Sequence, residues 1–245
     1  MEHVVLAETS GRVEAVMVTP GSYIAAGEML LVLEPVEMAL QDAGQQAEQD
    51  LNVIRDDLKA VQDRHAFLWD ANRAAAVAKR HAQGGRTARE NIGQLCDEGS
   101  FMEYGALAIA AQTRRRSPDD LIANTPADGM VTGIGTVNAQ VHGPEKSRCV
   151  DMAYDYTVLA GTQGAGNHQK TDRMLALAHK LQLPVVLFAE GRGGRPGDVD
   201  NPVVAGLNHH TFSQFAALSA RVPVIRPVPG RSFSVKAALP RHSHL

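Results

Sequence analysis

Residues 149–190 read CVDMAYDYTVLAGTQGAGNHQKTDRMLALAHKLQLPVVLFAE, and this segment predicts a strand, a helix and a second strand in succession. Apolar runs predict strands at 149–159 and 184–190, and the spacing over 168–182 predicts a helix between them. The same pattern continues outward, with strands at 129–137 and 222–228 and a helix at 209–220. Adjacent strands followed by a helix form a ββα unit, so the sequence predicts an α/β fold.

Three zones with different patterns divide the chain. Residues 1–37 alternate apolar and polar side chains and carry turn residues such as Gly11 and Pro20-Gly21, which predicts a small β half-sandwich. Residues 38–83 contain no proline, and their apolar side chains recur in steps of three and four. We therefore expect one linker helix at 38–83 that packs on a neighbouring domain, rather than a free coiled coil. Residues 84–245 form the α/β zone.

The apolar seam of the expected linker helix is short, and the polar residues His65 and Asn72 interrupt it. Its members are Leu51, Ile54, Leu58, Val61, His65, Leu68, Asn72 and Ala75. After it, Thr87-Ala88-Arg89-Glu90 fits a capping box, in which the Thr87 side chain accepts from a backbone N–H and the Glu90 side chain reaches back. A short helix is expected from there to about Cys96.

Composition excludes several classes of protein. The 24 Lys and Arg against 27 Asp and Glu give a net charge of −3, so non-specific nucleic-acid binding is not indicated. Cys96 and Cys149 form no CxxC pair, which argues against a structural zinc site and a disulfide scaffold. No apolar run approaches the ~20 residues of a membrane span, and the N-terminus lacks signal-peptide features. We expect a soluble, cytoplasmic protein with no metal site.

The glycine-rich segment 161–171 follows a predicted strand and opens a predicted helix. Its spacing does not fit a P-loop, because Asn167 stands where lysine should follow the second glycine. Glycines still let backbone amides approach an anion, and a helix N-terminus favours negative charge. A tight turn followed by a solvated first helical turn explains the segment equally well.

A second glycine-rich segment, 190–198, also follows an apolar strand run. It does not fit the dinucleotide fingerprint, because Pro196 stands where a glycine is needed. Its glycines and arginines suit the rim of a ligand site, and a flexible surface loop is the alternative. The run Arg114-Arg115-Arg116 is short and has no interleaved aromatic residues, so a solvated loop is favoured over a nucleic-acid patch.

Residues 1–34 begin with Met1-Glu2-His3-Val4-Val5 and carry the turn residues Pro20-Gly21, and this segment resembles part of a biotin-dependent acyl-CoA carboxylase. Residues 1–34 are similar to the second half of a biotinyl carrier domain, whose Ala-Met-Lys-Met motif is often followed by Glu-His-Val-Val. A second register places Glu37 at the biotinylated lysine, but we prefer the first because its match is contiguous. Neither register contains a lysine for biotin, and an unrelated β-hairpin module is the alternative.

The C-terminal zone resembles the N-terminal half of a carboxyltransferase domain of the crotonase-like superfamily. The segments that carry this resemblance are, in order, Thr87–Glu90, Asp97–Tyr104, Asp128–Gly135, Tyr154–Gly164 and the Gly-Arg-Pro-Gly-Asp loop at 194–198. The resemblance implies three parts: a partial biotinyl/lipoyl-like carrier domain at 1–37, a helical linker at 38–83, and a truncated crotonase-like ββα spiral at 84–245.

The resemblance also implies a reaction. Such enzymes move a carboxyl group from carboxybiotin to the α-carbon of an acyl-CoA through a thioester enolate, as in fatty acid metabolism. The enolate oxygen needs preorganised backbone donors. The resemblance places these donors at Ser234, Val235 and Lys236, although the family has glycine or a small residue near Val235. The expected CoA contacts are Gly161, Gly164, His168, Lys170, Arg173, Gly193, Gly194 and Arg195.

Cofactor and partners follow from the same resemblance. Biotin is expected on another chain, and the partners would be biotinyl carrier and biotin carboxylase components, within a homo-oligomer or a carboxylase complex. Because the chain stops at Leu245, before the second half that binds biotin in the family, we expect an incomplete fragment without carboxyl transfer of its own. The sequence does not define which acyl-CoA is bound.

Two alternatives remain open at this point. One is a non-catalytic subunit that binds CoA or assists assembly of a carboxylase. The other is a crotonase-like acyl-CoA hydratase or isomerase, which would need a carboxylate in the site, and Glu190 and Asp198 are available. The motifs that flank them fit carboxyltransferases better.

We predict that a biotin ligase does not biotinylate this chain. Lys59 is the first lysine, and it lies in the predicted helix rather than in a carrier hairpin. Incubation with ligase, ATP and biotin, followed by an avidin blot, should give no signal. A biotin adduct mapped to residues 1–40 would contradict the prediction.

Overall fold

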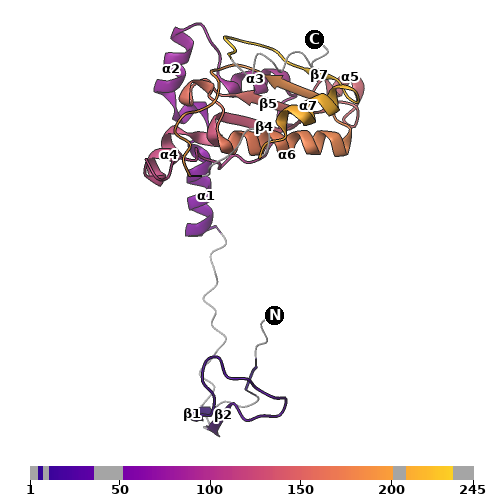
Figure 1. Cartoon of the computed structure of the whole chain (residues 1–245). Coiled ribbons are helices and arrows are strands. Elements are labelled where there is room, and N and C mark those ends of the chain that lie inside the picture. The colour runs from indigo at the N-terminus through magenta and orange to yellow at the C-terminus, as the bar shows by residue number, and fades with distance from the viewer. Residues whose placement is uncertain (1–4, 8–10, 36–51, 201–207, 234–245) are drawn as a thin grey trace. The chain divides into compact units, whose positions relative to one another are not determined.

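The computed structural model describes residues 5–7, 11–35, 52–200 and 208–233. Contacts divide the chain into two units, Met1–Ile54 and Arg55–Leu245, and Figure 1 shows both.

The first unit contains an antiparallel pair, β1 (Gly11–Val16) and β2 (Leu31–Pro35), with a register shift between Val13 and Ala15. Both strands lie where the sequence predicted β-structure. The strand expected around Val4 and Leu6 does not form at residues 5–7, and Val4 lies outside the described residues. The half-sandwich itself therefore stays a prediction.

The second unit is built on a five-stranded sheet. Its strands, in spatial order, are β3 (Met102–Glu103), β4 (Met130–Thr136), β5 (Arg148–Tyr154), β6 (Val185–Phe188) and β7 (Val224–Ile225). β4 pairs with β3 and β5 in antiparallel fashion, whereas β5, β6 and β7 are parallel. The predicted ββα unit and its continuation are confirmed as an α/β fold.

Helices cover both faces of this sheet. α6 (Ala165–Leu181) and α7 (Thr211–Ser219) pack on one face, and α3 (Ala88–Leu95) packs on the other (Figure 1). The main core, between the sheet and α6 and α7, contains fully buried Met152, Leu175 and Phe215. The capping box that starts α3 is confirmed, because Glu90 N donates to Thr87 Oγ1 and Thr87 N donates to the Glu90 carboxylate.

The prediction of one unbroken helix over 38–83 is wrong. The described part contains α1 (Asp56–Ala66) and α2 (Ala74–Ala82), separated by a 3₁₀ turn, η1 (Asp70–Asn72). The chain turns here because Leu68 is buried with Ala106 and Ala127, and because Asn72 Nδ2 donates to Ala66 O at the end of α1. Helix α1 buries none of its residues, and residues 38–51 lie outside the described part.

Short elements complete the second unit: α4 (Pro118–Asn124), α5 (Ala139–His142), η2 (Pro126–Gly129) and η3 (Leu159–Gly161). η2 and η3 are unusual because each contains a left-handed backbone. The φ values of Leu159, Ala160 and Gly161 are 47°, 56° and 65°, in the turn that leads from β5 to α6. Backbone strain of this kind costs about 1–3 kcal/mol per non-glycine residue and is concentrated at functional sites.

Within the described ranges, no helix is both long and apolar enough to cross a membrane.

Candidate functional site

Three loops meet beyond the carboxyl ends of β5, β6 and β7. Gln163 N donates to Gly193 O at 2.9 Å, and Arg195 N donates to Gln163 O at 2.6 Å. The loop that contains Gly193 and Arg195 also contacts the segment after β7, because Gly191 N donates to Arg231 O at 2.9 Å. The two glycine-rich segments of the sequence are therefore joined by backbone hydrogen bonds, at the edge of a parallel sheet where ligands usually bind.

Gly191 is required for this close approach. A Cβ atom on Gly191 would lie 2.5 Å from Gly161 O, and the φ of Gly191 is +117°, which side chains rarely allow. Any other residue at 191 would push the two loops apart.

The N-terminus of α6 is occupied by carboxylates of the chain itself. Ala165 N donates to Asp198 Oδ2 at 3.0 Å, and Asn167 N donates to Asp128 Oδ2 at 2.7 Å. Helix N-termini attract anions, and here that attraction is satisfied internally. The prediction that this helix start offers its amides to a phosphate is corrected accordingly.

Arg195 joins these two carboxylates. Its Nη1 donates to Asp128 Oδ1 and to Asp198 Oδ2, while its Nη2 donates to the carbonyls of Asp128 and Thr162 at 3.2 and 3.1 Å. The Arg195 side chain is only 2% exposed. It is therefore directed at partners inside the protein, whereas the sequence analysis expected Arg195 to contact CoA.

Glycines make this arrangement possible. A Cβ on Gly166 would lie 2.5 Å from Asp128 Oδ2, and a Cβ on Gly164 would lie 2.2 Å from Asp198 Oδ2. Gly164 and Gly166 thus leave space for the carboxylates of Asp198 and Asp128. The sequence analysis expected the glycines of this segment to leave space for an anionic ligand.

Lys170 also faces inward. Its Nζ donates to Ala127 O at 2.9 Å and to Met130 O, and so holds α6 to η2 and to the start of β4. Burial lowers the pKa of Lys170 to about 8. The ammonium group therefore links elements inside the protein. In this position Lys170 does not point toward a CoA molecule outside, as the sequence analysis expected.

The remaining predicted CoA contacts are dispersed. His168 stacks on His209, with ring centroids 4.8 Å apart, and Arg173 is exposed on α6. Gly194 and Arg195 line a pocket of about 510 Å³, together with Ala160, Thr162 and Arg192. The predicted donors Ser234, Val235 and Lys236 lie outside the described residues.

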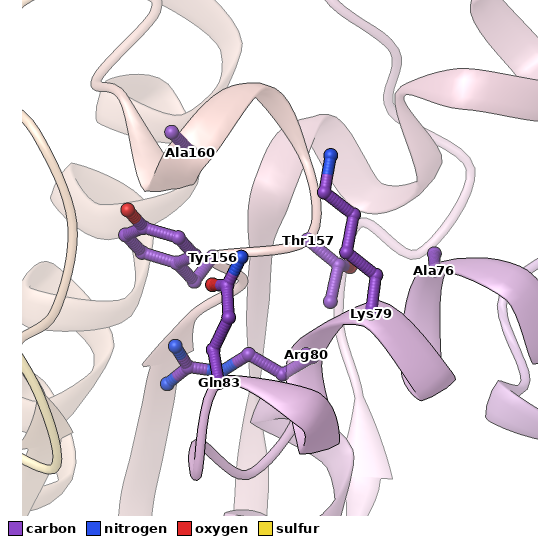
Figure 2. A pocket seen from close by; sticks show the side chains of 7 residues that line it. All are labelled: Ala76, Lys79, Arg80, Gln83, Tyr156, Thr157 and Ala160. Carbon is purple, nitrogen blue, oxygen red and sulfur yellow. The ribbon is translucent and has the colours of Figure 1, made fainter.

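A second pocket, of about 420 Å³, adjoins the first at Ala160 (Figure 2). Lys79, Arg80 and Gln83, at the end of α2, face Tyr156 and Thr157 across it (Figure 2). A third pocket, of about 320 Å³, shares Arg80 and Tyr156 and extends to Glu190 and Gly230. Each of the three pockets is lined in part by the η3 turn or by the 190–195 loop.

A buried ion pair connects α2 to this loop. Arg80 Nη2 donates to Glu190 Oε1 and Oε2 at 2.6 and 2.5 Å, and both side chains are buried. The Arg80 guanidinium also lies 4.8 Å from the centre of the Tyr156 ring, a cation–π contact. Sequence analysis missed Arg80, because no local pattern reveals a partner 110 residues away.

The two carboxylates considered for a hydratase are therefore both paired. Glu190 is held by Arg80, and Asp198 accepts from Arg195, Ala165 N and Gln112 Nε2. Within the described part of the chain, no three His, Cys, Asp or Glu side chains gather as metal ligands.

Comparison with known proteins identifies the family. A family model of the carboxyl transferase domain matches residues 79–244, so the chain belongs to this family. The propionyl-CoA carboxylase beta chain of Saccharopolyspora erythraea is 35% identical over 184 residues, which are 74% of this chain and 31% of that protein. The biotin-dependent acetyl-/propionyl-coenzyme A carboxylase beta5 subunit of Mycobacterium leprae is 35% identical over 160 residues, which are 64% of this chain and 26% of that protein.

Solved structures agree. A single-chain, multi-domain long-chain acyl-CoA carboxylase is 51% identical, with a TM-score of 0.74, over 100% of this chain and 22% of that one. The transcarboxylase 12S hexamer shares the fold, at 24% identity and a TM-score of 0.56, over 76% of this chain and 34% of that one. The resemblance to acyl-CoA carboxyltransferases is thus confirmed, and the chain spans about a third or less of these proteins.

We predict that Arg195→Met lowers the free energy of unfolding by about 3–5 kcal/mol, because it leaves the Asp128 carboxylate buried without its cation. Arg192→Met, an exposed arginine in the same loop, should change it by less than about 0.5 kcal/mol. Urea unfolding of both variants measures the difference. Similar stabilities for the two variants would contradict the structural role of Arg195.

A second prediction concerns pH and Lys170. Between pH 8 and pH 10.5 the folded state loses the Lys170 proton while the unfolded state keeps it, so stability should rise with pH. Relative to Lys170→Met, the free energy of unfolding of the wild type should rise by up to about 3 kcal/mol across this window. Urea unfolding at several pH values tests this, and a constant difference between the two proteins would refute it.

Proposed function

We propose that this chain forms the acyl-CoA-binding part of a biotin-dependent acyl-CoA carboxyltransferase. The observation that carries the proposal is the hydrogen-bonded junction of the 160–164 and 190–195 loops, which sets two pockets side by side at Ala160. The family match over residues 79–244 supports it.

In the proposed reaction, the N–C bond that joins the carboxyl group to biotin and an α C–H bond of the acyl thioester break, while a C–C bond forms between the α-carbon and the carboxyl carbon and the proton ends on the biotin nitrogen. Negative charge develops on the thioester oxygen and needs donors aimed at it. When bound, carboxybiotin supplies the carboxyl group and then a ureido nitrogen that accepts the α-proton. The chain's own part is to bind the CoA, orient the thioester and donate to its oxygen.

Backbone donors are the groups that fit this role. Among the described residues, no protein acceptor takes a hydrogen bond from the N–H of Gly194, which lines the 510 Å³ pocket. The segment 231–233, which leads into the proposed donors Ser234, Val235 and Lys236, pairs with Gly191 in the same loop. We infer that both loops contribute N–H groups to one oxyanion site.

An acyl-CoA hydratase or isomerase fits the geometry less well. That chemistry needs a carboxylate able to exchange a proton with substrate. Glu190 is instead held by Arg80 and is buried, and Asp198 is held by Arg195 with a side chain that is only 7% exposed. The carboxyltransferase proposal needs no carboxylate base.

The proposed partners follow from the relatives. The long-chain carboxylase that covers the whole of this chain is described as single-chain and multi-domain, which supports a carrier-like module at residues 1–37. No lysine precedes Lys59, so we propose that biotin arrives on another carrier segment. An oligomeric assembly with biotin carboxylase components, in the cytoplasm, completes the proposal.

We predict that Gly194→Val weakens acetyl-CoA and propionyl-CoA binding by about tenfold or more, equivalent to at least about 1.4 kcal/mol. A Cβ on Gly194 meets nothing within 4 Å, and Gly194 lines the pocket, so we expect the valine to take up pocket space without a clash at its Cβ. Gly93→Val is the matched control, since its Cβ also meets nothing within 4 Å and it lies on α3.

Calorimetry with the full chain measures these affinities, and a crotonyl-CoA hydration assay accompanies it. A folded wild-type chain that binds no acyl-CoA, or one that hydrates crotonyl-CoA, would overturn the proposed function.

A further inference from the structure

A fourth pocket, of about 740 Å³, lies on the face of the sheet that α3 covers, and we call it the Trp69 pocket. Its lining comes from the end of α1 and the turn after it, from α3 and the segment that follows, and from β3 and β4. In the described structure it shares no lining residue with the three pockets of the candidate site. Its volume lies within the range of small-molecule sites.

The interior of the Trp69 pocket is apolar. Ile92 and Val131 are 4% and 2% exposed, and both belong to the core cluster between α3 and the sheet. Phe101 packs against the same cluster and also lines the pocket. The pocket therefore reaches down to this core, and an apolar group bound there is removed from water.

A large aromatic ring is fixed at the mouth of the pocket. The Trp69 side chain is 54% exposed, and the Arg89 guanidinium lies 4.9 Å from the centre of its ring. Arg89 is itself held by Glu103, to which it donates two hydrogen bonds of 3.0 and 3.1 Å. The indole is thus held in place while about half of its surface stays open to a ligand, and a ring of this kind can stack on another ring.

Two carboxylates of the lining have no cationic partner. Arg89 and Glu103 pair with each other. Asp97 accepts a hydrogen bond of 2.7 Å from Thr136 Oγ1, which holds the pKa of Asp97 below its ordinary value and keeps this carboxylate charged. Glu98 is exposed, and within the described ranges neither Asp97 nor Glu98 takes part in an ion pair. The fixed charges of the pocket are therefore net negative.

We propose that the Trp69 pocket binds a small organic cation, in which an ammonium group is joined to an aromatic ring. The ring occupies the apolar interior beside Trp69 and Phe101, and the ammonium group lies by the carboxylates of Asp97 and Glu98. The same carboxylates repel phosphate groups, so this site is separate from the proposed acyl-CoA pockets. The pocket volume exceeds that of a single side chain, which favours a whole small molecule over one side chain of a partner protein.

Fluorescence of Trp69 reports on this pocket directly, because Trp69 is the one tryptophan in the sequence. The full chain is titrated with phenethylamine, phenethyl alcohol and phenylacetate, which share a benzene ring and differ in charge, and calorimetry provides a second readout. Phenethylamine should bind about fivefold more tightly than the alcohol, and phenylacetate should bind most weakly. Added salt should weaken binding of the amine and leave that of the alcohol unchanged.

Substitution of Glu98 tests the charge. Glu98→Gln should weaken phenethylamine binding about threefold and leave phenethyl alcohol binding unchanged. Glu145→Gln is the matched control, because Glu145 is an exposed carboxylate that does not line the pocket.

Substitution of Gly93 tests the location. A Cβ on Gly93 meets nothing within 4 Å, and Gly93 lines the pocket, so Gly93→Leu should take up pocket space and weaken both ligands about tenfold or more. Gly93→Ala, which adds only a methyl group, should have a much smaller effect. Thermal unfolding of each variant confirms that it folds.

Three results would overturn the inference. Equal affinity for the amine and the alcohol makes the pocket a purely apolar cleft, such as one that receives a side chain of a partner protein. Unchanged binding in a folded Gly93→Leu variant places the ligand elsewhere. A folded wild type that binds no phenethylamine, by fluorescence and by calorimetry, refutes the site outright. Each of these results leaves the acyl-CoA proposal intact, since the two sites share no lining residue in the described structure.

Discussion

The buried contact between Arg195 and the carboxylates of Asp128 and Asp198 is the interaction on which the candidate site depends. Arg195, in the loop after β6, pairs with the two carboxylates that accept hydrogen bonds at the N-terminus of α6. It also donates to Asp128 O in η2 and to Thr162 O between β5 and α6, and so holds these three segments together. A cation between two carboxylates at a helix N-terminus balances charges that would each be costly to bury alone.

Local patterns predicted most of the fold. The strands at 129–137, 149–159 and 184–190 and the capping box at Thr87 and Glu90 depend on neighbouring residues, so the sequence shows them directly. The break near Leu68 could not be seen in this way. Leu68 leaves the helical seam because it packs on Ala106 and Ala127, contacts that are far away in sequence.

The sequence identified the glycine-rich segments that form the candidate site, but it did not show which way the side chains beside them point. The two glycine-rich segments were recognised, and the structure joins them. The directions of Lys170 and Arg195 were misjudged because their partners, Ala127 and Asp128, lie 43 and 67 residues earlier. A basic residue near a glycine-rich turn suggests a phosphate contact, yet the same residue can neutralise a carboxylate of its own chain.

The hydrogen bonds of Asp198 and Asp200 to residues 112–114 affect how charge substitutions in this region act. Simple electrostatics says that removing an acidic residue beside a basic segment makes the local potential more positive and so favours anions. Here the acidic side chains set the position of the basic segment, so removing Asp200 frees the backbone that carries Arg115. The number of charges near Arg115 is thus a poor guide to the effect of a substitution here, because Asp198 and Asp200 hold the basic segment in position.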